Sequence, residues 1–120
     1  ISAYKYFILE RTFNRYMYMC NLYQDHSFER FLSFVEFELG KTNPLWQDEH
    51  IRRQSDFYTS AEVDCIVPLS KLNCFLEEKG VDIPEERSNA TSVQFELRDE
   101  KQIARIKELY RLDYEIPVSY

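Results

Sequence analysis

The side chains with the most chemical potential are few, and they lie far apart in the sequence. The chain has two imidazoles, His26 and His50, and we expect His26 to be a loop or cap residue. Trp46 offers a large aromatic face, which suits either a core plug between helices or a platform for a substrate. Ser2 and Asn89 add a hydroxyl and an amide that can hydrogen-bond a ligand. These groups predict binding contacts but no complete catalytic centre.

Cysteine and glycine usage narrow the chemistry further. The three cysteines, Cys20, Cys65 and Cys74, share no CxxC spacing, so we expect buried reduced thiols and neither a disulfide framework nor a metal site. The only glycines are Gly40 and Gly80, whereas a complete nucleotide-binding domain carries a Gly-rich loop that cradles phosphate. We therefore expect the main phosphate loop of any nucleotide site to lie outside this chain, which begins with Ile and not Met.

Length and composition suit one globular domain or part of one, spanning residues 1–120. Hydrophobic residues make up 44% of the chain and charged residues 30%, an ordinary globular composition. The net charge of −6 argues against broad electrostatic capture of nucleic acid, which needs a basic surface. No apolar run approaches the roughly 20 residues that span a bilayer, and no secretory signal opens the chain.

The first half of the chain shows helical periodicity. Apolar residues at helical spacing predict helices over 1–24 and 28–39, with Ser27 as the N-cap of the second helix. Gly40 follows as an expected left-handed C-terminal residue. Residues 41–61 have no clean period, and we expect an irregular, functional segment that holds a helical turn or two.

One segment has the composition of a strand. Val63–Val67 is short and rich in β-branched residues, and Pro68 ends it. Ser70 is then expected to cap a helix that ends at Gly80. With a second short extended piece at 93–97, the prediction is an α/β fold, mostly helical, with one or two strands in this chain. A lone strand leaves its backbone groups unpaired, so we expect it to pair with strands outside the chain or with a second copy.

A final helix closes the pattern. Asp99 and Gln102 have the spacing of a capping box, and an apolar stripe runs from Ile103 to Tyr110. Asp113, near the C-terminal end of this helix, opposes the helix dipole. We therefore expect Asp113 to have a specific partner, structural rather than catalytic.

Several short motifs occur in a definite order along nearly the whole chain. They are Ser2-Ala3-Tyr4 at the start of an aromatic helix, residues 27–35, Asn43-Pro44-Leu45-Trp46, residues 63–80, Asn89-Ala90-Thr91 and residues 106–114. The ordered set resembles the second half of the carbohydrate-modifying sulfotransferases and their bacterial relatives. One departure is Leu45, which stands where the family often has His before Trp.

The resemblance implies a fold, a reaction and a site. The fold is the C-terminal part of a P-loop-like α/β domain, and the reaction is transfer of a sulfuryl group to a hydroxyl acceptor. The donor co-substrate is 3′-phosphoadenosine 5′-phosphosulfate (PAPS), and no metal takes part. Ser2 matches the family's ligand of the donor 3′-phosphate, whereas Trp46, His50 and Asn89 fall where the acceptor, a carbohydrate in this reading, would bind.

The same resemblance implies a partner and a compartment. The donor-phosphosulfate loop belongs to an N-terminal half that is missing here, so the 120 residues alone are expected to be inactive. Bacterial members are soluble and animal members reside in the Golgi, and a cytoplasmic location is favoured. Two other interpretations remain open: a helical protein-interaction module without catalysis, and a nucleotide-kinase relative.

Overall fold

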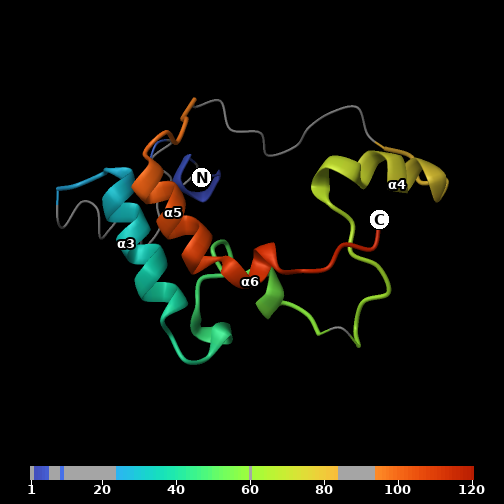
Figure 1. Ribbon diagram of the computed structural model, residues 1–120, viewed down its shortest axis with the longest axis horizontal. Helices are drawn as coiled ribbons and strands as arrows, with labels where there is room; N and C mark the ends of the chain where they lie inside the picture. Colours follow the sequence, from blue (N-terminus) through green and yellow to red (C-terminus); the bar gives the residue numbers. More distant parts are fainter. Residues whose placement is uncertain (1, 6–8, 10–23, 60, 84–93) are drawn as a thin grey trace.

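The computed structural model describes residues 2–5, 9, 24–59, 61–83 and 94–120 of the chain, and these residues form helices and 3₁₀ turns without a strand (Figure 1). In chain order the elements are α1 (Ser2–Tyr4), α3 (Phe28–Leu39), the 3₁₀ turns η2 (Pro44–Trp46), η3 (Gln54–Asp56) and η4 (Leu69–Lys71), then α4 (Leu72–Glu78), α5 (Glu100–Leu109) and α6 (Arg111–Tyr114). The helix predicted over 1–24 falls mostly on residues outside the described part of the chain. Within the described part, α1 is its α-helical portion.

Helix α3 has the predicted bounds and the predicted N-cap. The Ser27 hydroxyl accepts a hydrogen bond from the Arg30 amide at 3.1 Å, which satisfies one of the unpaired amides of the first turn. The prediction for Gly40 is wrong, because its φ is −78°, in the right-handed region. Its amide donates to the Glu36 carbonyl at 3.0 Å, so the backbone continues the helical turn through Gly40 instead of reversing there.

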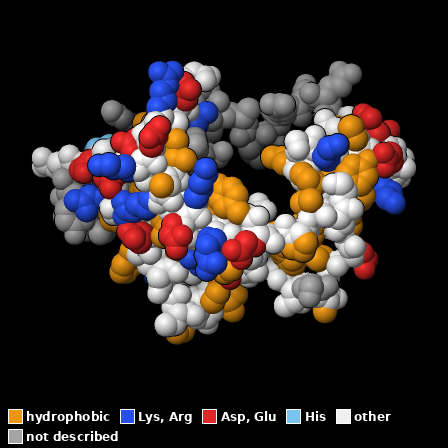
Figure 2. Space-filling model, in the orientation of Figure 1, with side chains coloured by type: hydrophobic (Ala, Val, Ile, Leu, Met, Phe, Trp, Pro, Cys, Tyr) orange, Lys and Arg blue, Asp and Glu red, His pale blue; other side chains and the backbone are white. Residues whose placement is uncertain are grey.

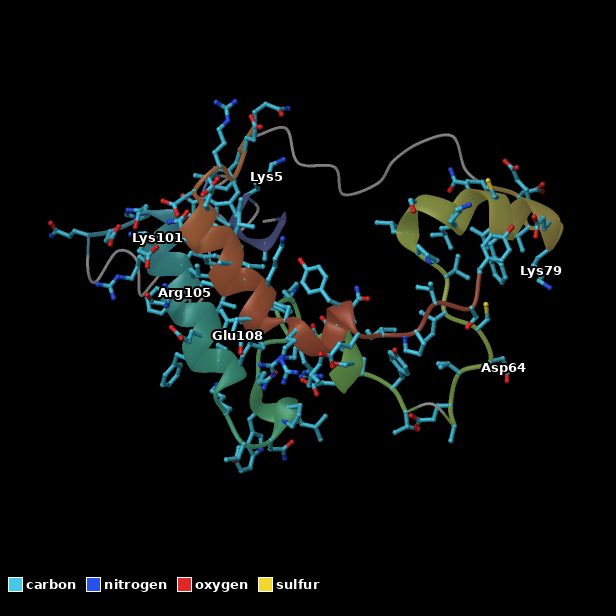
Figure 3. The ribbon with its side chains drawn as sticks, viewed as in Figure 1. Lys5, Asp64, Lys79, Lys101, Arg105 and Glu108 are labelled. Carbon is cyan, nitrogen blue, oxygen red and sulfur yellow. The ribbon has the colours of Figure 1, made fainter. Side chains whose placement is uncertain are left out.

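Helix α5 packs beside α3, and charged side chains connect the two helices (Figure 3). Arg105 of α5 binds Glu29 at 2.7 Å and also binds Glu36, so one guanidinium bridges two turns of α3. Asp99 caps α5 as predicted, accepting from the Gln102 amide at 2.9 Å. The Gln102 side chain donates to Glu29 at 3.0 Å, a contact with α3 that the capping-box pattern does not include.

The core lies between α1, α3 and the segment that leads into α5. Tyr4 is 4% exposed, and its ring lies 5.0 Å from the ring of Phe28 and 4.8 Å from that of Phe95. Its hydroxyl donates to the His26 carbonyl at 2.9 Å, so this buried polar group is satisfied. Leu32 is the most deeply buried member of the cluster. These contacts fix the start of the chain against α3.

The α/β prediction is wrong, because the described part of the molecule is helical and contains no sheet. Val63–Val67 is irregular backbone. The Ile66 carbonyl accepts from the Ser119 amide at 2.9 Å, and the Ile66 amide donates to the Ser119 hydroxyl at 3.2 Å. One backbone bond and one side-chain bond do not make a ladder, and β-branched composition favours a strand only where a partner is present. Residues 94–97 are also irregular, and residue 93 lies outside the described residues.

Helix α4 stands apart from the α3–α5 core (Figure 1). Ser70 lies inside η4 and does not cap α4, so that prediction is wrong. Gly80 ends the helix with a φ of 70°, and the Val81 amide donates to the Leu76 carbonyl at 2.9 Å, which is the Schellman arrangement. The radius of gyration is 16.5 Å, against about 14 Å for a compact domain of this length, as expected when one helix projects outward.

The C-terminal tail returns to α4 and holds it. The ring of Tyr120 meets that of Phe75 edge-on at 5.2 Å between centroids.

Cys65 and Cys74 are exposed free thiols, so the prediction of burial is wrong for both, and Cys20 lies outside the described residues. Among the described helices, none is long and apolar enough to cross a membrane.

Candidate functional site

The irregular segment between α3 and η3 is fixed to α3 by a buried carboxylate. Glu38 is 5% exposed, and its Oε1 accepts from the Lys41 ammonium at 2.9 Å. Its Oε2 accepts from the Asp48 backbone amide at 3.0 Å. A buried carboxylate costs free energy unless it is paired and hydrogen-bonded, and both conditions are met here. We refer to residues 43–56 as the clamped loop, because a second carboxylate holds its far end.

That second carboxylate is Asp113 of α6. Its Oδ2 accepts from the Gln54 amide at 2.9 Å, and its Oδ1 accepts from the Ser55 amide at 3.0 Å and from the Ser55 hydroxyl at 2.9 Å. The residue before η3, Arg53, gives the turn no side-chain cap, so Asp113 satisfies these amides from a distant part of the chain. The prediction that Asp113 has a specific structural partner is confirmed.

Two further bonds tie the clamped loop to the end of α5. Arg53 Nε donates to the Leu109 carbonyl at 2.7 Å, which neutralises part of the negative C-terminal end of α5. The Tyr110 hydroxyl donates to the Ile51 carbonyl at 2.6 Å. Burial, and secondarily the negative charge of Asp113, raise the pKa of Tyr110 from 10.0 to about 12, so the phenol is neutral at physiological pH.

The exposed face of the clamped loop carries Trp46. Trp46 is 66% exposed and neighbouring Leu45 is 75% exposed, so the interpretation of Trp46 as a core plug is wrong. Two hydrogen bonds hold the turn η2: the Asn43 side chain accepts from the Leu45 amide at 3.0 Å, and Lys41 Nζ donates to the Trp46 carbonyl at 3.0 Å. Lys41 Nζ also lies 5.9 Å from the ring centroid of Phe37, which is 69% exposed. We call the exposed aromatic residues Phe37 and Trp46, which share Lys41 as a neighbour, the aromatic platform.

His50 lies on the clamped loop with its ring held by Asp48. Asp48 Oδ1 lies 2.9 Å from His50 Nδ1 and also accepts from the His50 backbone amide at 2.9 Å. The side chain of His50 is 55% exposed. It lines a cavity of about 250 Å³ whose other described walls are apolar or aromatic. Those walls come from α1, α3, the clamped loop and the α5–α6 junction: Ala3, Phe28, Phe31, Leu32, Val35, Ile51, Ile106 and Tyr110.

The predicted site residues are only partly brought together. Ser2 opens α1, and Ala3, the next residue, lines the same cavity as His50. Trp46 is on the same loop as His50 but is not among the described lining residues. Asn89 lies outside the described residues. The ligand roles of all four residues therefore remain predictions.

Sequence reasoning missed the two residues that shape this site most. Asp48 precedes His50 by two positions, the spacing at which an Asp side chain bonds a following amide, so this contact had a local signal. Glu38 had no such signal, because it lies on the buried stripe of α3 where an apolar residue is expected.

The visible face of the molecule carries no single-sign charged region over α3 and α5, where acidic and basic side chains alternate (Figure 2).

Comparisons of the chain with protein-family models, with characterised proteins and with solved structures give no significant match.

Proposed function

We propose that this chain is the C-terminal portion of a sulfotransferase that moves a sulfuryl group from PAPS to a hydroxyl of a carbohydrate. The ordered motifs that resemble this family extend over nearly all of the 120 residues. In the proposal, the loop that binds the donor phosphosulfate belongs to another portion of the enzyme. The helical part described here supplies a contact to the donor 3′-phosphate and the surface that receives the acceptor.

The observation that carries the proposal is the shared cavity of α1 and the clamped loop. Ala3, which follows the proposed donor ligand Ser2, and His50, on the proposed acceptor loop, line the same cavity of about 250 Å³. Group transfer requires that donor and acceptor segments lie close together, because the reacting atoms must meet at about 3–3.5 Å. The two segments, far apart in the sequence, line one cavity, and this supports the proposal.

The aromatic platform suits a sugar. Sugars present apolar C–H faces that pack on aromatic rings, and a rigid aromatic surface binds with little loss of conformational entropy. The Trp46 carbonyl and the Leu45 amide are both hydrogen-bonded, so the turn is ordered before a ligand arrives. The Lys41 ammonium beside the platform is already paired with Glu38. The platform therefore favours an acceptor face without a negative charge.

A specific feature favours a second function, a helical interaction module. Around α4 and the tail, Leu69 is 85% exposed, Val118 60% and Val81 48%. Apolar side chains gather over this part of the visible face (Figure 2), and such patches are typical of protein contacts. A pure interaction module would bind neither PAPS nor its product.

The experiment that separates the two functions is calorimetric titration of the full-length protein and its Ser2→Ala variant. The ligands are adenosine 3′,5′-bisphosphate and adenosine 5′-monophosphate, which lacks the 3′-phosphate. A hydrogen bond to a charged group contributes about 1.5–3 kcal/mol, so Ser2→Ala should weaken bisphosphate binding by roughly ten- to a hundredfold. Monophosphate binding should change far less.

A matched control is Ser33→Ala on α3, whose hydroxyl bonds the Glu29 carbonyl at 3.1 Å and lies outside the cavity. This variant should leave both affinities unchanged. Equal losses for the two ligands in Ser2→Ala would show that Ser2 supports the helix and not the phosphate. Failure of the wild-type protein to bind the bisphosphate would favour the interaction module, and tighter binding of ATP would favour a nucleotide kinase.

A further inference from the structure

Helix α4 and the C-terminal tail have no core of their own. We call residues 61–83 and 115–120 the α4–tail unit. None of these residues is buried, and the apolar stripe of α4, formed by Leu72, Phe75 and Leu76, is only half-buried. Most helical stability in proteins comes from packing an apolar face, and short helices are marginal in water without it. Helix α4 has 7 residues, so it has an apolar face that a further surface can still cover.

The tail covers part of α4, and exposed apolar side chains remain around it. The ring of Tyr120 packs edge-on against that of Phe75, and its hydroxyl donates to Glu78, which is the main reason that the pKa of Tyr120 is raised to about 12. By contrast, Leu69, just before α4, is 85% exposed, and Val118, on the tail, is 60% exposed. Apolar side chains gather over this part of the visible face (Figure 2). Such a patch is typical of a contact with another protein.

The charge of the α4–tail unit is strongly negative. The unit holds six of the chain's 21 acidic side chains but two of its 15 basic ones, so it accounts for −4 of the net charge of −6. No ion pair within the described part of the chain includes Asp64, Glu77 or Asp82. Asp64 points outward from the ribbon (Figure 3). Glu77 and Asp82 lie at the C-terminal end of α4, where the helix dipole disfavours negative charge, so they do not serve to stabilise the helix.

Charge and backbone together select the kind of partner. A second copy would bring two negative surfaces together, and nucleic acid or anionic lipid would be repelled for the same reason. An extended peptide adds to the edge of a sheet, whereas the described residues of the α4–tail unit form no strand. A helix whose apolar stripe is bordered by Lys and Arg matches both the apolar side chains and the negative charge of the unit.

We propose that the α4–tail unit is a docking surface for a basic amphipathic helix of another protein. The apolar stripe of the partner helix packs over Leu69 and Val118, and its Lys and Arg side chains pair with Asp64, Glu77 and Asp82. This role is independent of sulfuryl transfer, because no residue of the unit is among the described residues that line the cavity of about 250 Å³.

The test measures the binding of designed peptides to the full-length protein by fluorescence anisotropy. The probe is a labelled helical peptide of Leu and Lys in which Leu recurs at positions i, i+3, i+4 and i+7. One control peptide has Glu in place of every Lys, and a second has the same Leu and Lys residues in scrambled order. The amphipathic Leu–Lys peptide should bind roughly tenfold more tightly, or better, than either control.

One double variant tests the apolar part of the surface. Leu69→Ser combined with Val118→Ser removes two exposed apolar side chains and should weaken binding of the Leu–Lys peptide by roughly tenfold or more. Leu45→Ser is the matched control, since Leu45 is 75% exposed on the clamped loop, and it should leave the affinity unchanged.

A second double variant tests the charged part. Glu77→Gln combined with Asp82→Asn should weaken binding by about three- to tenfold and make it less sensitive to salt, because fewer charge pairs remain to be screened. Glu108→Gln is the matched control, since it removes an exposed carboxylate of α5, and it should change neither the affinity nor the salt dependence.

The exposed thiol of Cys74 on α4 reports where the peptide lies. Alkylation of Cys74 by iodoacetamide, followed by mass spectrometry, should be rapid in the free full-length protein and slower with the Leu–Lys peptide bound. If Cys74 resists alkylation before the peptide is added, another part of the full-length protein covers the unit and the proposal is wrong.

The other outcomes are also distinct. Equal affinity for the amphipathic and scrambled peptides would show that charge alone attracts them, and this would overturn the amphipathic partner. Absence of binding, or binding that both double variants leave unchanged, would overturn the docking site. Self-association of the wild-type protein that is lost in Leu69→Ser with Val118→Ser would assign the surface to a second copy instead.

Discussion

Replacing Asp113 with alanine should loosen the clamped loop at its far end. The substitution removes three acceptor contacts at once: the Gln54 amide at 2.9 Å, the Ser55 amide at 3.0 Å and the Ser55 hydroxyl at 2.9 Å. Loss of a helix-capping acceptor costs about 0.5–2 kcal/mol. Loss of a charged acceptor from a buried donor costs about 1–3 kcal/mol.

The contacts differ in burial, and this sets the expected magnitude. The Gln54 bond is exposed, so water replaces the carboxylate there and the cost is near the low end, about 0.5–1 kcal/mol. The two Ser55 bonds are partly buried, and together they should cost about 1.5–2 kcal/mol. The expected loss in the free energy of unfolding is therefore about 2–3 kcal/mol.

The assay combines urea unfolding with amide hydrogen exchange. The unfolding midpoint should fall without a change in the m-value, and protection should drop at the amides of Gln54 and Ser55. Asp113→Asn keeps one acceptor oxygen and should lose less stability. Glu115→Ala is the matched control, since it removes only an exposed pair with Arg111 at 3.2 Å and should cost at most about 0.5 kcal/mol. If Asp113→Ala and Glu115→Ala cost the same, the carboxylate does not clamp the loop.

Two further predictions concern Tyr110, which bonds the clamped loop, and Trp46, which lies on it. Burial raises the pKa of Tyr110 from 10.0 to about 12. The contribution of Tyr110 to stability is therefore complete below about pH 10 and is lost as the pH rises from about 10 to 12. When unfolding is measured across this pH window, Tyr110→Phe should lose less stability than the wild-type protein. Trp46 is 66% exposed, so Trp46→Ala should change the free energy of unfolding by less than about 0.5 kcal/mol. Loss of its stacking should nevertheless raise the KM for a sugar acceptor by about three- to tenfold, with Lys71→Ala on distant η4 as the control.

The elements that the sequence predicts well are those with local causes. The stripe of α3 and its Ser27 cap lie within a few residues of each other, and the Asp99 cap of α5 does too, so these features follow from spacing alone. Gly80 takes the left-handed conformation that ends α4, whereas Gly40 does not. Both glycines follow an apolar helical stripe, so the sequence pattern does not distinguish their backbone conformations.

The features that the sequence does not predict depend on distant partners. Val63–Val67 has strand composition, but the neighbour that it meets among the described residues is the tail at Ser119, which offers a single backbone bond. Asp113 binds Ser55, 58 positions away, so its need for a partner was predictable but the partner was not. By contrast, the contact between Asp48 and His50 is local and could have been predicted.

The proposed sulfuryl transfer can be measured through its two products. The full-length protein is incubated with PAPS that carries radiolabelled sulfur and with unsulfated oligosaccharides, and both products are quantified. We expect labelled sugar and adenosine 3′,5′-bisphosphate in equal amounts, and no transfer by residues 1–120 alone. If no oligosaccharide acquires label from the full-length protein, or if the isolated 120 residues transfer sulfur by themselves, the proposed function is wrong.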